Sequence, residues 1–226
     1  MSTIFTTTLD QQPFAFPLGK IVCVGRNYAA HAAELNNAIP TAPILFIKPA
    51  TAAVRLAQEF SIPRDRGAVH HEVELALLIG ETLQNANRET VHAAIAGIGI
   101  ALDLTLRDVQ DQLKKDGHPW ERAKAFDGSY PVSHFINACD IDLQNLTVEL
   151  WRNGKLQQSG NTAQMLFPVL DLLCEMSRTF TLLPGDIVST GTPAGVGPLH
   201  GGDALVAVLK TESGELLHLN TTVTTL

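Results

Sequence analysis

Apolar and polar positions along the chain recur mostly with the short period of a β-strand. Short apolar runs flanked by Gly, Pro, Asn or Asp predict buried or half-buried strands. The Asn153–Gly154 pair between two such runs predicts a tight hairpin, because both residues tolerate the left-handed backbone that this turn requires. The strands expected from these runs cover residues 20–24, 43–48, 71–79, 95–102, 146–151, 155–158, 186–190, 204–209 and 216–222.

Helical periodicity is confined to short segments, at residues 28–37, 89–94, 105–115 and 167–179. The third is the most amphipathic, since Leu106, Val109 and Leu113 recur at helical spacing and Gly117 follows as a stop signal. The small residues of 28–37, and the Pro40 that follows them, are typical of a mobile lid. We therefore expect a single α+β domain whose core is a mixed, mainly antiparallel β-structure with short peripheral helices.

Composition narrows the classes of function. The 226 residues are 45% hydrophobic, enough for a sizeable core, and carry a formal net charge of −7 with the basic residues scattered. This disfavours a nucleic-acid partner, although a local pocket of Lys and Arg can still hold a small anion. No run approaches the roughly 20 apolar residues of a membrane span, and the first residues show no secretory signal. With three scattered cysteines, Cys23, Cys139 and Cys174, these features predict a soluble cytoplasmic protein without membrane partners.

The acidic residues of the strand 71–79 are the first candidates for chemistry. Glu72 and Glu74 project from one face of this strand, where two carboxylates repel each other unless a positive group lies between them. Asp103 follows the strand 95–102, so it can complete a three-carboxylate site for a hard cation such as Mg²⁺. Two alternatives stay open: a solvated strand face paired with Lys or Arg, and an Asp103 that caps the next helix.

Basic and polar side chains follow at positions that can hold an anion beside such a metal. Arg107 and Gln110 share one face of the helix 105–115, and Lys124 comes shortly after it. Lys48 closes an apolar strand and precedes Pro49, which favours a side chain directed into a site. The alternative for each of these side chains is a solvated surface group.

The lid segment and a glycine-rich loop complete the candidate site. His31 and Glu34 are three residues apart on the helix 28–37, so the carboxylate can orient the imidazole as a general base; the alternative is a weak surface pair. The loop that begins with Gly191 and Thr192 can present backbone amides and a hydroxyl to a carboxylate, or can be a plain turn. No Gly-x-Ser-x-Gly motif occurs, which disfavours a protein nucleophile.

Six segments together resemble the fumarylacetoacetate hydrolase family, in particular its short, single-domain acylpyruvase and oxaloacetate decarboxylase branch. The segments occur in the family's order and span roughly positions 20 to 200. They are VGRNYAAH (24–31), ILFIKP (44–49), HEVELA (71–76), ALDLTLRDVQ (101–110), KAFD (124–127) and STGTP (189–193).

The resemblance implies a β-roll fold, usually a homodimer, with Mg²⁺ or Mn²⁺ as cofactor and a small 2-oxo acid as substrate. Two features depart from the longer family members: the chain shows no separate N-terminal domain, and residues 21–25 lack a further carboxylate ligand. We expect residues 1–18 to be an N-terminal extension packed on a single catalytic domain, residues 19–226. The residues that the resemblance assigns are Glu72, Glu74 and Asp103 to the metal, His31, Glu34 and Lys124 to catalysis, and Lys48, Arg107, Gln110 and Thr192 to substrate binding.

The implied activity is a metal-dependent hydrolase that cleaves a carbon–carbon bond of an acylpyruvate to give pyruvate and a carboxylic acid. Loss of CO₂ from oxaloacetate reaches the same pyruvate enolate, so decarboxylation is a second implied activity. The alternatives among enzymes are an isomerase, hydratase or decarboxylase of the 2-oxo diacids of aromatic catabolism, resembling 2-hydroxyhepta-2,4-diene-1,7-dioate isomerase, and an oxaloacetate tautomerase. The alternative outside enzymes is a non-catalytic module that binds Ca²⁺ or a metabolite.

Overall fold

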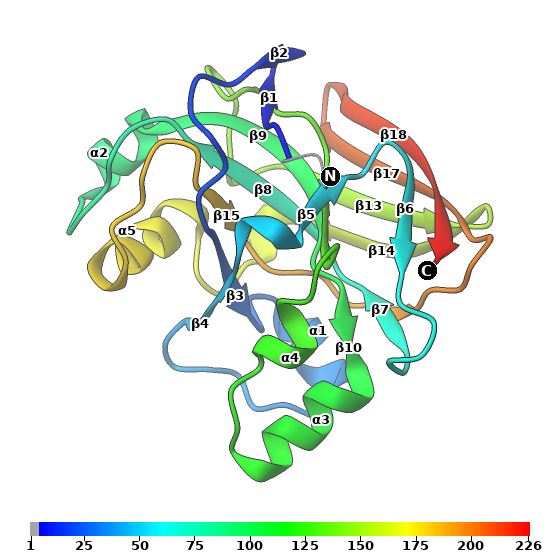
Figure 1. Cartoon of the computed structure of the whole chain (residues 1–226). Helices are drawn as coiled ribbons and strands as arrows, with labels where there is room; N and C mark the ends of the chain where they lie inside the picture. The colour runs from blue at the N-terminus through cyan, green and yellow to red at the C-terminus, as the bar shows by residue number, and fades with distance from the viewer. Residues whose placement is uncertain (1–4) are drawn as a thin grey trace.

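A computed structural model describes residues 5–226, which form two large β-sheets (Figure 1). The first four residues of the expected N-terminal extension lie outside the described part. The larger sheet consists, in spatial order, of β4 (Ile44–Lys48), β3 (Ile21–Gly25), β15 (Ile187–Ser189), β8 (Val73–Ile79), β9 (Ile95–Leu102), β11 (Tyr130–Val132) and β5 (Ala53–Arg55), with β12 (Ile136–Asn137) paired to β9.

The second large sheet lies on the right of Figure 1. Its order is β14 (Lys155–Asn161), β13 (Thr147–Arg152), β17 (Ala204–Thr211), β18 (Gly214–Thr225) and β6 (Gln58–Ile62). Two small sheets are β10 (Thr105–Leu106), β7 (Val69–His71) and β16 (Gly197–Pro198), and the pair β1 (Thr8–Leu9) and β2 (Gln12–Pro13). The parallel pairs of the described strands are β15–β3, β11–β5 and β18–β6, and the remaining pairs are antiparallel. The predicted mixed, mainly antiparallel β-core is confirmed.

The helices are short and peripheral, as expected. In Figure 1, α1 (Ala29–Glu34), α3 (Arg107–Asp116) and α4 (Glu121–Lys124) gather at one end of the larger sheet, while α2 (Arg88–Ala93) and α5 (Val169–Thr179) pack together at another edge. Two turns of 3₁₀-helix occur at Ala50–Ala52 and Thr162–Gln164. No helix within residues 5–226 has the length and apolar character needed to cross a membrane.

The centre of the core is β8, which is buried on both faces. Val73, Leu75 and Leu77 belong to the main hydrophobic cluster, which β13 of the second sheet also joins. Ala76 and Leu78 belong to a smaller cluster on the opposite face, which is covered by apolar residues of the N-terminal segment: Phe5, Leu9, Phe14 and Leu18. A strand with two apolar faces tolerates carboxylates only at its end, which is where the acidic residues lie.

The predicted boundaries of one strand and one helix beside the acidic residues are wrong. The strand expected from residue 71 is broken at Glu72, and the helix expected from residue 105 begins at Arg107. The cause is the three-stranded sheet, in which Thr105 and Leu106 pair with His70 and Val69. The chain leaves the larger sheet before Glu72 and after Asp103 to form this pairing. The acidic residues therefore lie where the three-stranded sheet and the larger sheet separate.

Candidate metal centre and active site

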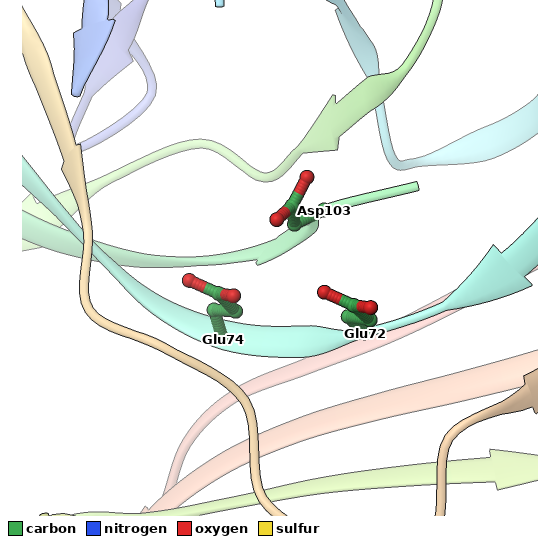
Figure 2. A group of neighbouring side chains, drawn as sticks. All are labelled: Glu72, Glu74 and Asp103. Carbon is green, nitrogen blue, oxygen red and sulfur yellow. The ribbon is translucent and has the colours of Figure 1, made fainter. Parts of the chain in front are cut away.

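Three carboxylates meet where β8 begins and β9 ends, and Figure 2 shows their oxygens turned toward a common centre. Glu72 directly precedes β8, Glu74 is the second residue of β8, and Asp103 follows the last residue of β9. The backbone N–H of Asp103 donates to the carbonyl of Glu72 at 2.8 Å, so strand pairing itself sets their separation. One oxygen from each carboxylate lies within 4.8 Å of the others, and all three side chains are buried. The structure thus brings together the three residues expected to be metal ligands.

Glu72 is neutralised by two basic side chains. Its carboxylate accepts hydrogen bonds from Arg107 Nη2 and from Lys124 Nζ, the latter at 2.7 Å. Burial acts to raise the pKa of Glu72, but Lys124 and Arg107 outweigh it and hold the pKa well below its ordinary value. Glu72 is therefore ionised at neutral pH.

Asp103 lies between two lysines. Its Oδ2 accepts a hydrogen bond from Lys124 Nζ at 2.6 Å, while its Oδ1 lies 2.8 Å from Lys48 Nζ. The second contact lacks the angles of a hydrogen bond, so Oδ1 is buried without a donor and the contact is purely electrostatic. Burial acts to lower the pKa of Lys124, but Asp103 and Glu72 raise it above its ordinary value, so this side chain stays an ammonium.

Glu74 has no cationic partner among residues 5–226. Its Oε2 accepts hydrogen bonds from the Ser189 hydroxyl at 2.5 Å and from the backbone N–H of Gly191 at 2.7 Å. These bonds act to lower its pKa, but burial and the neighbouring Asp103 act more strongly and raise the pKa to about 8. Glu74 is the one carboxylate of the cluster that the protein's own charges do not stabilise in ionised form.

The donor set fits a hard divalent cation. All its donors are carboxylate oxygens, which Mg²⁺ and Mn²⁺ prefer over nitrogen or sulfur. A cation would supply the positive charge that Glu74 lacks and could also bind Oδ1 of Asp103, which accepts no hydrogen bond. Ion pairing with Lys and Arg, the alternative to a metal, accounts for Glu72 and for both oxygens of Asp103 but not for Glu74.

Lys48, which the sequence predicts to bind substrate, is not brought into the pocket by the structure. Its side chain is completely buried and does not border the pocket that contains the carboxylates. The ammonium donates to the Lys124 and Ser129 carbonyls and to Ser129 Oγ, which leaves no hydrogen for a ligand. Lys48 instead fixes the segment that carries Lys124 and places its positive charge behind Asp103.

The other residues expected to bind substrate border the same pocket as the carboxylates. Arg107 and Gln110 lie one turn apart on α3, and Arg107 Nη1 donates to Gln110 Oε1 at 2.7 Å. Thr192 comes from the loop after β15, and its hydroxyl oxygen accepts a hydrogen bond from Gln158 at 2.8 Å. All three are buried, so a small anion in this pocket would meet polar groups that water reaches poorly.

His31 and Glu34, the expected catalytic pair, lie close together but are not hydrogen-bonded to each other. His31 is buried on α1 and borders the pocket, and its Nδ1 lies 3.5 Å from Glu34 Oε2 without the geometry of a hydrogen bond. Both oxygens of Glu34 accept the backbone N–H of Gly195, each at 3.1 Å. Burial lowers the pKa of His31, with Glu72 opposing the shift, so the imidazole is neutral at pH 7 and can accept a proton.

Sequence reasoning missed Gln158, which holds the Thr192 loop in place. Its amide donates to Thr192 Oγ1 and to the Pro193 carbonyl, each at 2.8 Å, and its Oε1 accepts from the backbone N–H of Val73 at 3.0 Å. The same Oε1 lies 2.9 Å from Nδ1 of His71. In the sequence Gln158 is one polar position in an alternating strand, so nothing local distinguishes it from a solvated side chain.

Asn27 was also missed, and it joins the segment before α1 to the same loop. Its fully buried amide bonds the carbonyls of Thr190 at 2.8 Å and Phe167 at 3.1 Å, and its oxygen accepts the N–H of Phe167 at 2.8 Å. A Cβ on Gly191 would lie 2.6 Å from the Asn27 Cβ, and the φ of Gly191 is +97°, so only glycine fits there. The presence of Asn27 inside the motif VGRNYAAH was the available signal.

The fold and the donor set define a mixed β-protein with a buried carboxylate site at one end of its central sheet. Residues 20–224 match the family model described as "Fumarylacetoacetate (FAA) hydrolase C-terminal". The chain belongs to this family and is one of its enzymes, which confirms the resemblance seen in the sequence motifs.

Individual members of the family are similar to this chain over most of its length. The chain is 54% identical over 200 residues to oxaloacetate tautomerase YcgM of Escherichia coli (strain K12), covering 88% of this chain and 91% of that protein. It is 43% identical over 188 residues to the mitochondrial oxaloacetate tautomerase FAHD1 of Bos taurus, covering 83% and 85%. The crystal structure of fumarylpyruvate hydrolase from Pseudomonas aeruginosa in complex with Mn²⁺ and pyruvate superposes with a TM-score of 0.90 at 32% identity, covering 100% and 98%.

Proposed function

We propose that this chain is a Mg²⁺- or Mn²⁺-dependent enzyme that interconverts the enol and keto forms of oxaloacetate. The observation that carries the proposal is Glu74, a buried carboxylate without a cationic partner, set beside Glu72 and Asp103 in the pocket that His31 and Lys124 also border. The names of the 54% and 43% identical relatives support this reaction. Acylpyruvate hydrolysis, which the sequence alone favoured, becomes the second candidate.

The roles of the binding residues follow from their places in the pocket. Glu72, Glu74 and Asp103 would hold the metal, which when bound would draw electron density from the carboxylate and 2-oxo group of the substrate. The substrate carboxylate would lie against Arg107, Gln110 and Thr192, which are buried and carry hydrogen-bond donors. These contacts fix the 2-oxo group relative to His31 and Lys124.

The proton transfer of tautomerisation would be carried out by His31. In the enol-to-keto direction O2 loses its proton, the C2–C3 double bond becomes a C2=O double bond, and C3 gains a proton. Because Nδ1 faces Glu34, the Nε2 atom of His31 is left to accept the O2 proton and return it to C3, directly or through water. Glu34 would stabilise the transient imidazolium, and the Lys124 ammonium would donate a hydrogen bond to O2 as negative charge develops there.

Hydrolysis of an acylpyruvate stays a candidate because one observation favours it. The 32% identical neighbour is a fumarylpyruvate hydrolase, and the same His31–Glu34 pair could activate a water molecule against the C4 carbonyl. In that reaction the water oxygen forms a bond to C4, the C3–C4 bond breaks, and C3 takes up a proton to give pyruvate.

The test is the ultraviolet absorbance of the enol form of oxaloacetate after it is dissolved in buffer with the Mg²⁺-loaded protein. We expect the enol band to decay faster with enzyme than without it, and this acceleration to disappear with a chelator or with Asp103→Asn. Acetylpyruvate would be followed in parallel. If acetylpyruvate is cleaved while the oxaloacetate enol decays at the uncatalysed rate, the tautomerase proposal is wrong and the hydrolase is favoured.

A further inference from the structure

Two basic side chains border the pocket without belonging to the carboxylate cluster. Arg26, directly after β3, and Lys114, in the last turn of α3, line the same pocket as Glu72 and Asp103. Within residues 5–226, Arg26 makes no ion pair or side-chain hydrogen bond, and Lys114 has only Asp111 of its own helix, at 3.7 Å. The described residues therefore leave Arg26 without an anionic partner and pair Lys114 only loosely.

The surrounding structure holds these two cations near each other. Lys114 Nζ lies 5.8 Å from the centroid of the Trp120 ring, and the same ring packs against Gly25, the residue before Arg26. Arg26 itself has a φ of +61°, in the left-handed region that a residue with a long side chain rarely adopts. Such backbone strain is found where a side chain has to be directed into a site.

The electrostatics of Lys114 agree with this placement. Burial lowers the pKa of its ammonium, and the nearby Arg107 and Arg26 lower it further, while Asp111 and Glu72 oppose the shift. Arg107 already pairs with Glu72, so the remaining repulsion between Lys114 and Arg26 would be relieved by an anion from outside the chain.

We infer that Arg26 and Lys114 form a subsite for a second carboxylate, at the end of the substrate that lies away from the metal ligands. The inference rests on the proposed function and deepens it, because it restricts the substrate class to 2-oxo dicarboxylic acids such as oxaloacetate. A substrate with an apolar tail would cover both cations without pairing them, which costs affinity, whereas a carboxylate would accept charge-assisted hydrogen bonds from both.

The test compares two 2-oxo acids that differ in the distal group alone. 2-Oxoglutarate carries a carboxylate where 2-oxopentanoate carries a methyl group, and binding of each to the Mg²⁺-loaded protein is measured by titration calorimetry. We expect wild type to bind the diacid at least about tenfold more tightly, the fold-change typical of a hydrogen bond to a charged group. Lys114→Met and Arg26→Met should each weaken diacid binding about tenfold and leave monoacid binding within about twofold.

Matched variants separate this role from a general loss of charge or folding. Lys115→Met removes the neighbouring ammonium of α3, which is exposed and does not border the pocket, and should leave the diacid preference unchanged. Lys114→Arg keeps the charge and should retain the preference. The inference is overturned if wild type does not distinguish the two acids, if both acids lose affinity equally in Lys114→Met, or if Lys115→Met has the same effect.

Turnover is not needed for this experiment, so its result is independent of the tautomerase assay. A diacid preference that depends on Arg26 and Lys114 in a protein that leaves enol oxaloacetate untouched would support the subsite and refute the proposed reaction. Active tautomerisation with no effect of either substitution would do the reverse.

Discussion

The three clustered carboxylates differ in what neutralises each of them, and the difference decides how each should respond to substitution. Glu72 has Arg107 and Lys124, whereas Glu74 accepts only neutral hydrogen bonds and has a pKa raised to about 8. In the metal-free protein Glu74 therefore holds a proton at neutral pH. Because a metal ligand must be ionised, binding of the cation is expected to release this proton.

Glu74→Gln and Glu72→Gln should differ in their effect on the stability of the metal-free protein. An amide mimics the protonated Glu74 closely, so Glu74→Gln should leave metal-free stability within about 1 kcal/mol of wild type while weakening Mg²⁺ binding strongly. Glu72→Gln leaves two buried cations with less negative charge, so it should destabilise the protein by about 3 kcal/mol or more.

Urea unfolding in chelator and Mg²⁺ titration calorimetry measure the two effects. Equal destabilisation by both substitutions would contradict the assignment of the proton to Glu74. Unchanged Mg²⁺ affinity in Glu74→Gln would remove this residue from the metal ligands.

The raised pKa of Glu74 also predicts how stability depends on pH. Between its ordinary value of 4.5 and the folded value of about 8, the folded state binds more protons at this residue than the unfolded state, so stability falls as pH rises. From pH 7 to pH 8 the metal-free protein should lose roughly 1 kcal/mol, and saturating Mg²⁺ should abolish the loss because Glu74 is then ionised.

The interval from pH 7 to pH 8 lies above the range in which His31, His70 and His71 titrate. Burial lowers the pKa values of His31, His70 and His71, so these residues destabilise the fold only as pH falls below about 6.5. The measurement is urea unfolding at pH 7 and pH 8, with chelator and with Mg²⁺. A metal-free stability that is constant or rises over this interval would show that Glu74 is already ionised.

At the scale of elements, β14 of the second sheet serves as the support for the loop that carries Thr192. Gln158 bonds Thr192 Oγ1 and the Pro193 carbonyl, and a Cβ on Gly160 would lie 2.5 Å from Pro193 Cβ. The Thr192 hydroxyl also donates a long hydrogen bond of 3.5 Å to the Pro193 carbonyl, and a closer ligand oxygen can replace this acceptor. The hairpin thus acts on the pocket through hydrogen bonding rather than by touching the substrate.

Gln158→Glu should raise the KM for the 2-oxo acid about tenfold with a smaller change in kcat. A carboxylate cannot donate to Thr192 or Pro193, and the Thr192 hydroxyl would turn to donate to it instead. The effect should be largely absent when Thr192→Ala is already present, which steady-state kinetics of the four variants of a double-mutant cycle would show.

The control for this cycle is Gln157→Glu, which adds the same charge one residue away on β14, where the side chain bonds only the Lys155 carbonyl. It should leave KM and kcat unchanged. Additive effects of Gln158→Glu and Thr192→Ala would mean that Gln158 does not act through the loop.

The sequence pattern predicted the strands and turns that are determined by the residues within them. β9 has the predicted bounds, and the expected hairpin turns at Asn153 and Gly154, with φ of +51° and +76°. β7, β10 and β16 could not be predicted, because strands of two or three residues leave no periodic signal and form only through pairing with each other. The break at Glu72 follows from that pairing and was missed with it.

In the candidate site, too, the residues placed by local pattern could be predicted, and those placed by distant partners could not. Glu72, Glu74 and Asp103 could be predicted to converge, because strand alternation and strand ends place them. The position of Lys48 outside the pocket could not be predicted, since its acceptors come from Lys124 and Ser129, far along the chain. Spacing along one strand or helix carries no information about such partners.

At the scale of the whole molecule, the expected oligomeric state is a proposal that can be checked directly. We propose a homodimer, as the family resemblance implies. Light scattering coupled to size-exclusion chromatography should give twice the chain mass of 24.4 kDa, independent of Mg²⁺, because the metal ligands come from β8 and β9 of a single chain. A mass of one chain at micromolar concentration would contradict the proposal.

The pocket as a whole combines a site for a divalent cation with basic groups for an anionic substrate. These opposite charges coexist because Arg107 and Lys124 are already paired with Glu72. Glu74 lacks a cationic partner, and we propose that Lys114 pairs with an anion from outside the chain. On the proposed function, this arrangement would let an acidic protein concentrate a 2-oxo acid at one end of its central sheet.

The most direct measurement is the anomalous scattering of Mn²⁺ in crystals of the protein grown or soaked with that ion. One Mn²⁺ per chain is expected, with oxygens of Glu72, Glu74 and Asp103 at about 2.1 Å from it. Crystals saturated with Mn²⁺ that show no anomalous peak between these three carboxylates, or a peak held by other residues, would contradict the metal centre and the chemistry derived from it.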